Sequence, residues 1–141
     1  ELLENPKIIV PNFVIVSDNP DKPGRLTSID SIAKNEAIFD VSPESFTDLE
    51  KILMSAGTIL WNGPLGFFEK ENFDKGTIKI AKMICSSKGF SVAGGGDTIA
   101  AAQKAGVLGK LDYVSTAGGA FLEFMEGRKL PGVEALRDKV N

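Results

Sequence analysis

Three consecutive glycines followed by an aspartate form the stretch of this sequence best suited to chemistry. An apolar run leads into them and an alanine-rich segment (99–106) follows, an order that predicts a strand, a tight loop and a helix. Glycines lack Cβ atoms, so a ligand can approach main-chain N–H groups, which the first turn of a helix leaves unpaired at the positive end of its dipole. The stretch therefore predicts a site for an anion such as phosphate, built on Gly94, Gly95, Gly96, Asp97 and Thr98.

The same residues also fit a simpler structure that needs no ligand. The glycines can form a tight turn between strand and helix, and Asp97 can be the N-cap that such a helix favours. Two further glycine clusters, at 63–66 and 118–119, also follow apolar runs. Three glycine loops favour a ligand site over three unrelated turns if the fold brings them together.

The order of apolar runs and helical segments predicts an α/β fold. Apolar runs at 58–61, 91–93 and 111–116 are each followed by a glycine-containing loop and a helical segment. Apolar strands joined by helices indicate a three-layer, Rossmann-like parallel sheet with helices on both faces and right-handed crossovers. In such sheets ligands bind beyond the carboxyl ends of the strands, where all three glycine loops fall.

The remaining segments carry weaker patterns. We expect strands within 7–16 and at 36–41, and a surface loop at 17–27. Ser42-Pro43 begins a helix that ends at Gly57, because a hydroxyl N-cap and an N1 proline precede an apolar stripe. Further helices are expected at about 72–88, 120–126 and 133–140, and residues 1–4 have the pattern of a helix end.

Composition excludes several kinds of chemistry. The 141 residues fit one domain, 1–141, with a formal net charge of -3. We expect no nucleic-acid partner, since there is no basic stripe, and no membrane partner, since no apolar run could span a bilayer; a cytoplasmic protein is the simplest expectation. The chain has no histidine and one cysteine, Cys85, so histidine-dependent catalysis and cysteine-based zinc clusters are excluded within it. Cys85 lies in a segment where Ile78, Ala81 and Ile84 recur at helical spacing, so we expect it to be a packing residue.

The polar residues at the predicted sheet edge suggest how an anion would be held. Gly118 and Gly119 can direct N–H groups at a negative oxygen, and the Asn62 amide can donate to phosphate or ribose. Asp97 beside a phosphate is unfavourable unless a cation lies between them, and Mg²⁺ fits one carboxylate plus phosphate oxygens. The sequence has neither a Walker P-loop nor a dinucleotide-binding glycine motif. Trp61 is most simply a core residue, and Glu69 a solvated carboxylate.

Four motifs together resemble one enzyme family. They are Trp61 to Glu69, Gly94 to Thr98, Val114 to Ala120 and Leu130 to Val133. In this order and spacing they closely resemble the C-terminal part of phosphoglycerate kinase, over about residues 8–136. The resemblance implies that residues 1–141 are the C-terminal portion of that enzyme's nucleotide-binding lobe, with the sheet truncated at its N-terminal side.

The resemblance also implies an activity and roles for particular residues. The family transfers a phosphoryl group in glycolysis between 1,3-bisphosphoglycerate with ADP and 3-phosphoglycerate with ATP, using Mg²⁺, and we expect the parent enzyme to be monomeric. Gly118 and Gly119 would stabilise the phosphoryl group in transfer. Glu69 would hold the ribose, Asp97 the Mg²⁺ and Thr98 the phosphates. The nucleotide site would be lined by Asn62, Gly63, Pro64 and Phe67.

The sequence also departs from the family pattern. Ala117 replaces a usual glycine, Phe121 a frequent serine and Ile38 a glycine of the adenine pocket. The family's N-terminal lobe, with its basic substrate site and catalytic arginine, is missing, as is the phosphate-binding lysine. We therefore expect no kinase activity and only weak Mg-ADP binding from this chain alone. A first residue other than methionine suggests a piece of a longer protein or a trimmed mature form.

Two other functions remain possible on the sequence alone. The glycine loops can belong to a non-catalytic module that binds a nucleotide or phosphometabolite. A nicotinamide-dependent dehydrogenase is disfavoured because the dinucleotide motif is missing.

Overall fold

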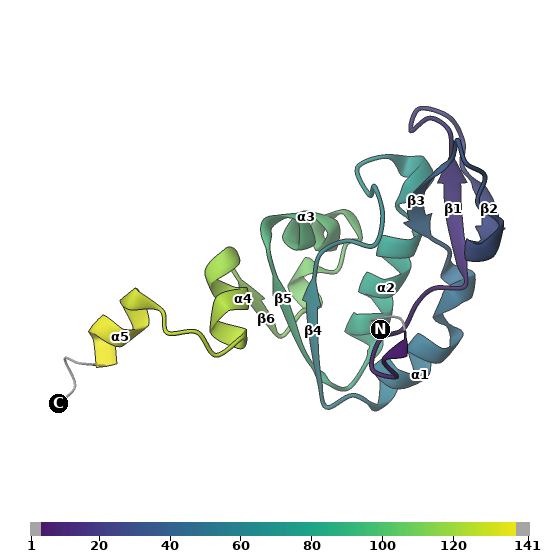
Figure 1. Ribbon diagram of the computed structural model, residues 1–141. Helices are drawn as coiled ribbons and strands as arrows, with labels where there is room; N and C mark the ends of the chain where they lie inside the picture. Colours follow the sequence, from purple (N-terminus) through teal and green to yellow (C-terminus); the bar gives the residue numbers. More distant parts are fainter. Residues whose placement is uncertain (1–3, 138–141) are drawn as a thin grey trace.

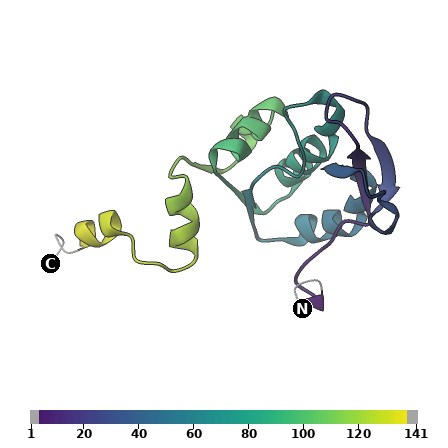
Figure 2. The ribbon, with the colours of Figure 1, turned by 45° about the horizontal axis from the view of Figure 1, so that its top comes forward.

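The structure is a computed structural model that describes residues 4–137 and contains two three-stranded sheets with helices beside them (Figure 1). The helix-end pattern at residues 1–4 lies mostly outside the described residues. Two views show a compact body from which the C-terminal helices extend (Figures 1 and 2). Among the described residues, no helix combines the length and apolarity needed to cross a membrane.

An antiparallel sheet forms the N-terminal part of the body. Its strands are β1 (Phe13–Ser17), β2 (Arg25–Ser28) and β3 (Ala37–Val41), in the order β2-β1-β3. The short strand at 36–41 is confirmed, but the expectation of a surface loop throughout 17–27 was wrong at both ends, because Ser17 belongs to β1 and residues 25–27 to β2. β2 pairs with β1 at the edge of the sheet, and Thr27 is the one residue of β2 that is buried. A strand with so little buried surface needs no apolar pattern, so the sequence of β2 does not indicate a strand.

The second sheet is parallel, as predicted. It consists of β4 (Thr58–Asn62), β5 (Phe90–Gly94) and β6 (Tyr113–Ser115), in the order β4-β5-β6. Helix α2 (Lys75–Ser86) connects the first two strands, and α3 (Gly96–Lys104) connects the last two. The predicted α/β fold, a parallel sheet flanked by helices, is confirmed.

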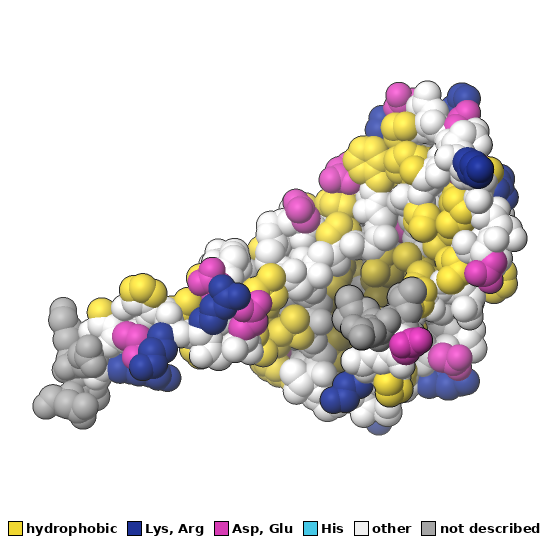
Figure 3. Space-filling model, viewed as in Figure 1, with side chains coloured by type: hydrophobic (Ala, Val, Ile, Leu, Met, Phe, Trp, Pro, Cys, Tyr) yellow, Lys and Arg dark blue, Asp and Glu magenta, His cyan; other side chains and the backbone are white. Residues whose placement is uncertain are grey.

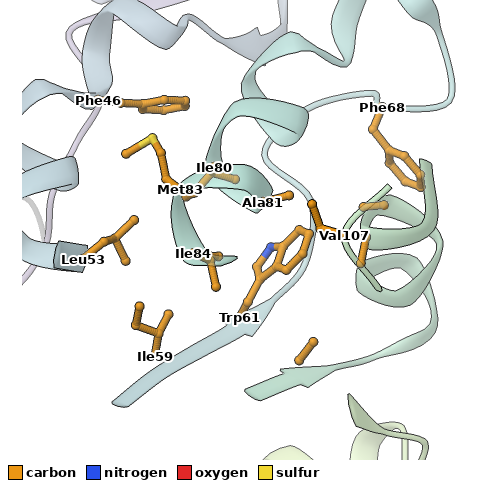
Figure 4. Close-up of a cluster of buried hydrophobic side chains, with 13 residues drawn as sticks. Phe46, Leu53, Ile59, Trp61, Phe68, Ile80, Ala81, Met83, Ile84 and Val107 are labelled. Carbon is orange, nitrogen blue, oxygen red and sulfur yellow. The ribbon is translucent and has the colours of Figure 1, made fainter. Parts of the chain in front are cut away.

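One face of the parallel sheet packs on the main core. Ile59 and Trp61 of β4 point toward the helices, where they join Ala81 and Ile84 of α2 (Figure 4). Leu53 of α1 (Thr47–Ser55) belongs to the same cluster. Cys85 is half-buried against this core, and burial raises the pKa of its thiol. This agrees with a packing role.

The opposite face of the sheet is covered unevenly. Side chains alternate between faces along a strand, so Leu60, Phe90 and Tyr113 share this second face, and each is exposed. Helix α4 (Gly119–Met125) reaches only its carboxyl end, where the ring of Phe121 fills the space beside Gly94. Hydrophobic side chains are visible on the side of the molecule that carries β4 (Figure 3).

The helix ends follow local signals in part. Ser42 is an N-cap as predicted, and its hydroxyl accepts a hydrogen bond from the Glu44 N–H. The element that it caps is a 3-10 turn (Pro43–Phe46), and α1 begins only after this turn. α2 is shorter than expected because residues 71–73 form a separate 3-10 turn. Helix α5 (Pro131–Arg137) begins before the predicted range, whose last residues lie outside the described part of the chain.

Candidate functional site

The three predicted loops leave the same edge of the parallel sheet. Asn62, the last residue of β4, is paired with Gly94 at the end of β5. Gly94 is in turn paired with Ser115, the last residue of β6. The register therefore confirms that the loops after Trp61, Ala93 and Thr116 start side by side, and we call this edge the carboxyl rim.

The first loop is tied to the second by two hydrogen bonds. The Asn62 side-chain amide donates to the Gly94 carbonyl oxygen at 2.8 Å, and the Gly63 N–H donates to Thr98 Oγ1 at 2.7 Å. Gly63 has φ of 95°, a conformation that side chains disfavour. Trp61 is a core residue as predicted, 5% exposed, but its indole N–H also donates to the Gly63 carbonyl at 2.8 Å.

The second loop begins helix α3. Gly95, with φ of 93°, is the N-cap, and Gly96 is the first helical residue. Asp97 therefore lies within the first turn, and the alternative that it caps the helix is wrong because no side chain caps α3. Its carboxylate is exposed at the positive end of the helix dipole, beside the first-turn N–H groups that lack intrahelical partners.

Thr98 has a structural partner that its sequence position does not reveal. It is 1% exposed, and its hydroxyl oxygen accepts from the Gly63 N–H across 35 residues of sequence. Because a hydroxyl that accepts can still donate, the Thr98 proton remains available to a neighbouring oxygen.

The third loop carries the other pair of glycines. Gly118, with φ of 56°, is the N-cap of α4, and Gly119 is its first residue. A Cβ added to either glycine would meet nothing within 4 Å, so both are open. The Ala117 N–H donates to Ser115 Oγ at 3.4 Å. A hollow of about 260 Å³ lies beside this loop, lined in part by Ser115, Ala117 and Phe121.

The segment that continues the first loop is attached to two other elements. The Leu65 N–H donates to Thr77 Oγ1 of α2 at 3.1 Å, and the Phe67 N–H donates to the Phe39 carbonyl of β3 at 2.7 Å. The Phe67 ring, 37% exposed, stacks on Phe39 with centroids 6.3 Å apart. Pro64 is half-buried and Glu69 is exposed.

A salt bridge holds the far end of this segment to α3. Lys104 Nζ lies 2.9 Å from Asp74 Oδ2 and also donates to the Phe68 carbonyl at 2.5 Å. Phe68 itself is buried. Nothing in the sequence spacing of Lys104 and Asp74 indicates this pairing.

Asp40 is a buried carboxylate that the sequence patterns above did not single out. It is 0% exposed on β3, and desolvation raises the pKa of its carboxyl to about 6, against the opposing effect of backbone N–H groups. Its place between the apolar Phe39 and Val41 was the available signal, because a lone carboxylate in an apolar strand needs partners.

The residues at the rim offer too few ligands to hold a metal ion by themselves. They fit a metal ion that phosphate oxygens of a bound substrate also coordinate. Among the described residues, no three acidic or cysteine side chains group into a metal-ligating cluster. Asp97 offers one exposed carboxylate. Mg²⁺ is commonly bound by one or two carboxylates together with substrate phosphates and water, so the donor set is compatible with that arrangement.

The fold and the rim define an α/β protein with glycine-rich loops beyond the carboxyl ends of a parallel sheet. The model of the family described as phosphoglycerate kinase matches residues 2–128. The chain belongs to the phosphoglycerate kinase family. The Leu130 to Val133 motif lies beyond the matched residues.

Solved structures of the family agree with this assignment. Phosphoglycerate kinase from Coxiella burnetii is 46% identical over 89% of this chain, with a TM-score of 0.83. The enzyme from Pyrococcus horikoshii OT3 is 36% identical over 91% of the chain, with a TM-score of 0.77. The matches cover 33% and 32% of those proteins, so this chain spans about a third of their length.

Proposed function

We propose that this chain is the C-terminal nucleotide-binding part of a phosphoglycerate kinase and that it holds Mg-ADP or Mg-ATP at the carboxyl rim. The observation that carries the proposal is the meeting of Asn62, Gly94 and Ser115 at one sheet edge, from which three glycine loops extend. Two of these loops lead into helix starts, which favour bound anions.

The roles of the rim residues follow from their positions. Phe67 presents an exposed, stacked ring to the adenine, and Glu69 an exposed carboxylate to the ribose hydroxyls. The first-turn N–H groups of α3, from Gly96 to Thr98, receive phosphate oxygens. Asn62, Gly63, Pro64, Gly94 and Gly95 form the surrounding wall.

The metal-binding and transfer roles fall to two other places on the rim. Asp97 would hold the Mg²⁺, which neutralises phosphate charge. Gly118 and Gly119 are open and lie at a helix start, where their N–H groups can stabilise the phosphoryl group during transfer.

In the whole enzyme, the reaction would be the reversible transfer between 1,3-bisphosphoglycerate and ADP. The chain spans about a third of its relatives, and we assign the acceptor side to the remaining part. The chain alone is then expected to show no turnover in a coupled assay. We place the complete enzyme in the cytoplasm as a monomer.

Calorimetry with Mg-ADP tests the nucleotide site. Asp97→Ala should weaken the affinity about tenfold, because the Mg²⁺ that binds the phosphates would lose its carboxylate ligand from the protein. Asp48→Ala is the matched control, since Asp48 is also an exposed aspartate in the first turn of a helix, α1. Unchanged affinity in Asp97→Ala, or an equal loss in both variants, would contradict the proposed site.

A further inference from the structure

The observation that leads furthest lies beneath the rim, at the buried carboxylate of Asp40. Oδ1 accepts a hydrogen bond from the Val41 N–H at 2.8 Å, and Oδ2 accepts one from the Gly76 N–H at 2.8 Å. Gly76 is in the first turn of α2, where N–H groups lack intrahelical acceptors. Asp40 therefore joins the antiparallel sheet to the start of the helix behind the rim.

Two glycines make room for this carboxylate. A Cβ at Gly66 would overlap Asp40 Oδ1 and would lie 2.6 Å from the Phe39 carbonyl oxygen. A Cβ at Gly76 would lie 2.5 Å from Asp40 Oδ1. The first rim loop and α2 thus approach Asp40 from two sides. At both contact points the space admits a glycine but not a residue with a Cβ atom.

The residues next to Asp40 and Gly76 hold the first loop. Phe39 accepts from the Phe67 N–H, and Thr77, which follows Gly76, accepts from the Leu65 N–H. We propose that Asp40 is a positioning residue that fixes the first rim loop, residues 62–69, for nucleotide binding. This inference rests on the proposed function, because it concerns the loop to which the adenine and ribose contacts are assigned.

The charge state of Asp40 gives the proposal a readout. Burial, with a smaller contribution from the nearby carboxylate of Asp74, raises the pKa of Asp40 to about 6, although the Gly76 and Val41 N–H groups act to lower it. Asp74 is itself paired with Lys104. The chain contains no histidine, so no side chain with an ordinary pKa in this range competes. Protonation converts one acceptor oxygen into a donor, which removes an anchor of α2 or of β3.

Trp61 reports on the loop independently of any nucleotide. It is the one tryptophan of the chain, and its indole N–H donates to the carbonyl of Gly63 within the loop. Its indole resonance and the Gly76 amide resonance can be followed by NMR from about pH 7.5 to about pH 5. Both should titrate with a midpoint of about 6 in the unmodified chain.

Asp40→Asn removes the titration while keeping the size of the side chain. Asp112→Asn is the matched control, because Asp112 also accepts two hydrogen bonds, from the Ser91 N–H and hydroxyl, at the amino end of the sheet. We expect the titration to persist in Asp112→Asn and to vanish in Asp40→Asn. The latter should already show the low-pH indole position at about pH 7.5.

Affinity for Mg-ADP completes the test. Asp40→Asn should weaken binding about tenfold, and Asp112→Asn should leave it unchanged. Unaltered Trp61 resonances and affinity in Asp40→Asn would overturn the positioning role. If Asp40→Asn does not fold, absence of the Trp61 titration in the unmodified chain overturns it. Should no form of the chain bind Mg-ADP, the proposed function fails, whereas the Trp61 titration still decides whether Asp40 controls the loop.

Discussion

Two loops of the same rim are held in different ways. The first loop is bonded to three separate elements, with Gly63 attached to α3, Leu65 to α2 and Phe67 to β3. The third loop is held locally, through the Ala117 N–H to Ser115 and the Phe121 N–H to Gly118. The first loop is therefore held in place by α2, α3 and β3 before any ligand binds, whereas the conformation of the third loop depends on the short helix α4.

The largest expected effect concerns pH and Asp40, beneath the first loop. Its folded-state pKa of about 6 lies above the ordinary 3.8, so its contribution to stability is fully present below pH 3.8 and is lost as pH rises through 6. The chain should therefore gain about 3 kcal/mol relative to Asp40→Asn as pH falls from about 7 to about 3.

Urea unfolding of both proteins at several pH values measures this difference. Global stability should rise while the Trp61 resonance reports a loosened loop, so the two readouts move in opposite directions. A constant difference between the two proteins across this range would show that Asp40 titrates normally.

A second test places the same methyl group in each loop. Gly66→Ala should cost about 2 to 3 kcal/mol, because the added Cβ meets the backbone of Phe39 and Asp40. Gly119→Ala, where the Cβ meets nothing within 4 Å, should change stability by less than about 0.5 kcal/mol. Urea midpoints compare them, and equal losses would remove the distinction between the loops.

A third test removes one anchor of the first loop. Thr98→Val leaves the partly buried Gly63 N–H without an acceptor, which should cost about 1.5 kcal/mol and weaken Mg-ADP binding. Thr98→Ser keeps the hydroxyl and should retain most of the affinity. Thr116→Val, at an exposed position beside the third loop, serves as control, and a comparable loss there would argue against a special role for Thr98.

The smallest effect is expected from the third loop. Phe121→Ala removes a half-buried ring from the space beside Gly94, and should cost about 1 kcal/mol in thermal or urea unfolding. Because the first loop is anchored elsewhere, the Trp61 indole resonance should not move. A shifted resonance would mean that the two loops are coupled across the rim.

The sequence was enough to predict the parallel sheet and the rim. The strands and glycine loops around Asn62, Gly94 and Ser115 are local patterns, and parallel topology then places their ends together. The apolar residues of β4 and β5 did not reveal that one face is exposed, since Leu60 and Phe90 are as apolar as the buried Ile59.

Features built from distant contacts were beyond prediction from the sequence. β2 is a polar edge strand whose pairing with β1 is set by the sheet and not by its own composition. Asp40 is buried only because β3, the first rim loop and α2 meet around it. The hydroxyl of Thr98 likewise gains its partner, Gly63, only after both strands are aligned.

The exposed second face of the parallel sheet affects how the folded state can be diagnosed. Leu60, Phe90 and Tyr113 are 41%, 53% and 54% exposed there in the native fold. A dye that fluoresces when it binds apolar surfaces should therefore show enhanced fluorescence with the folded chain. Such a signal is usually taken to indicate a molten globule. Near-ultraviolet circular dichroism of the buried Trp61 would distinguish the native fold from a molten globule, since the indole keeps fixed surroundings only while the core is packed.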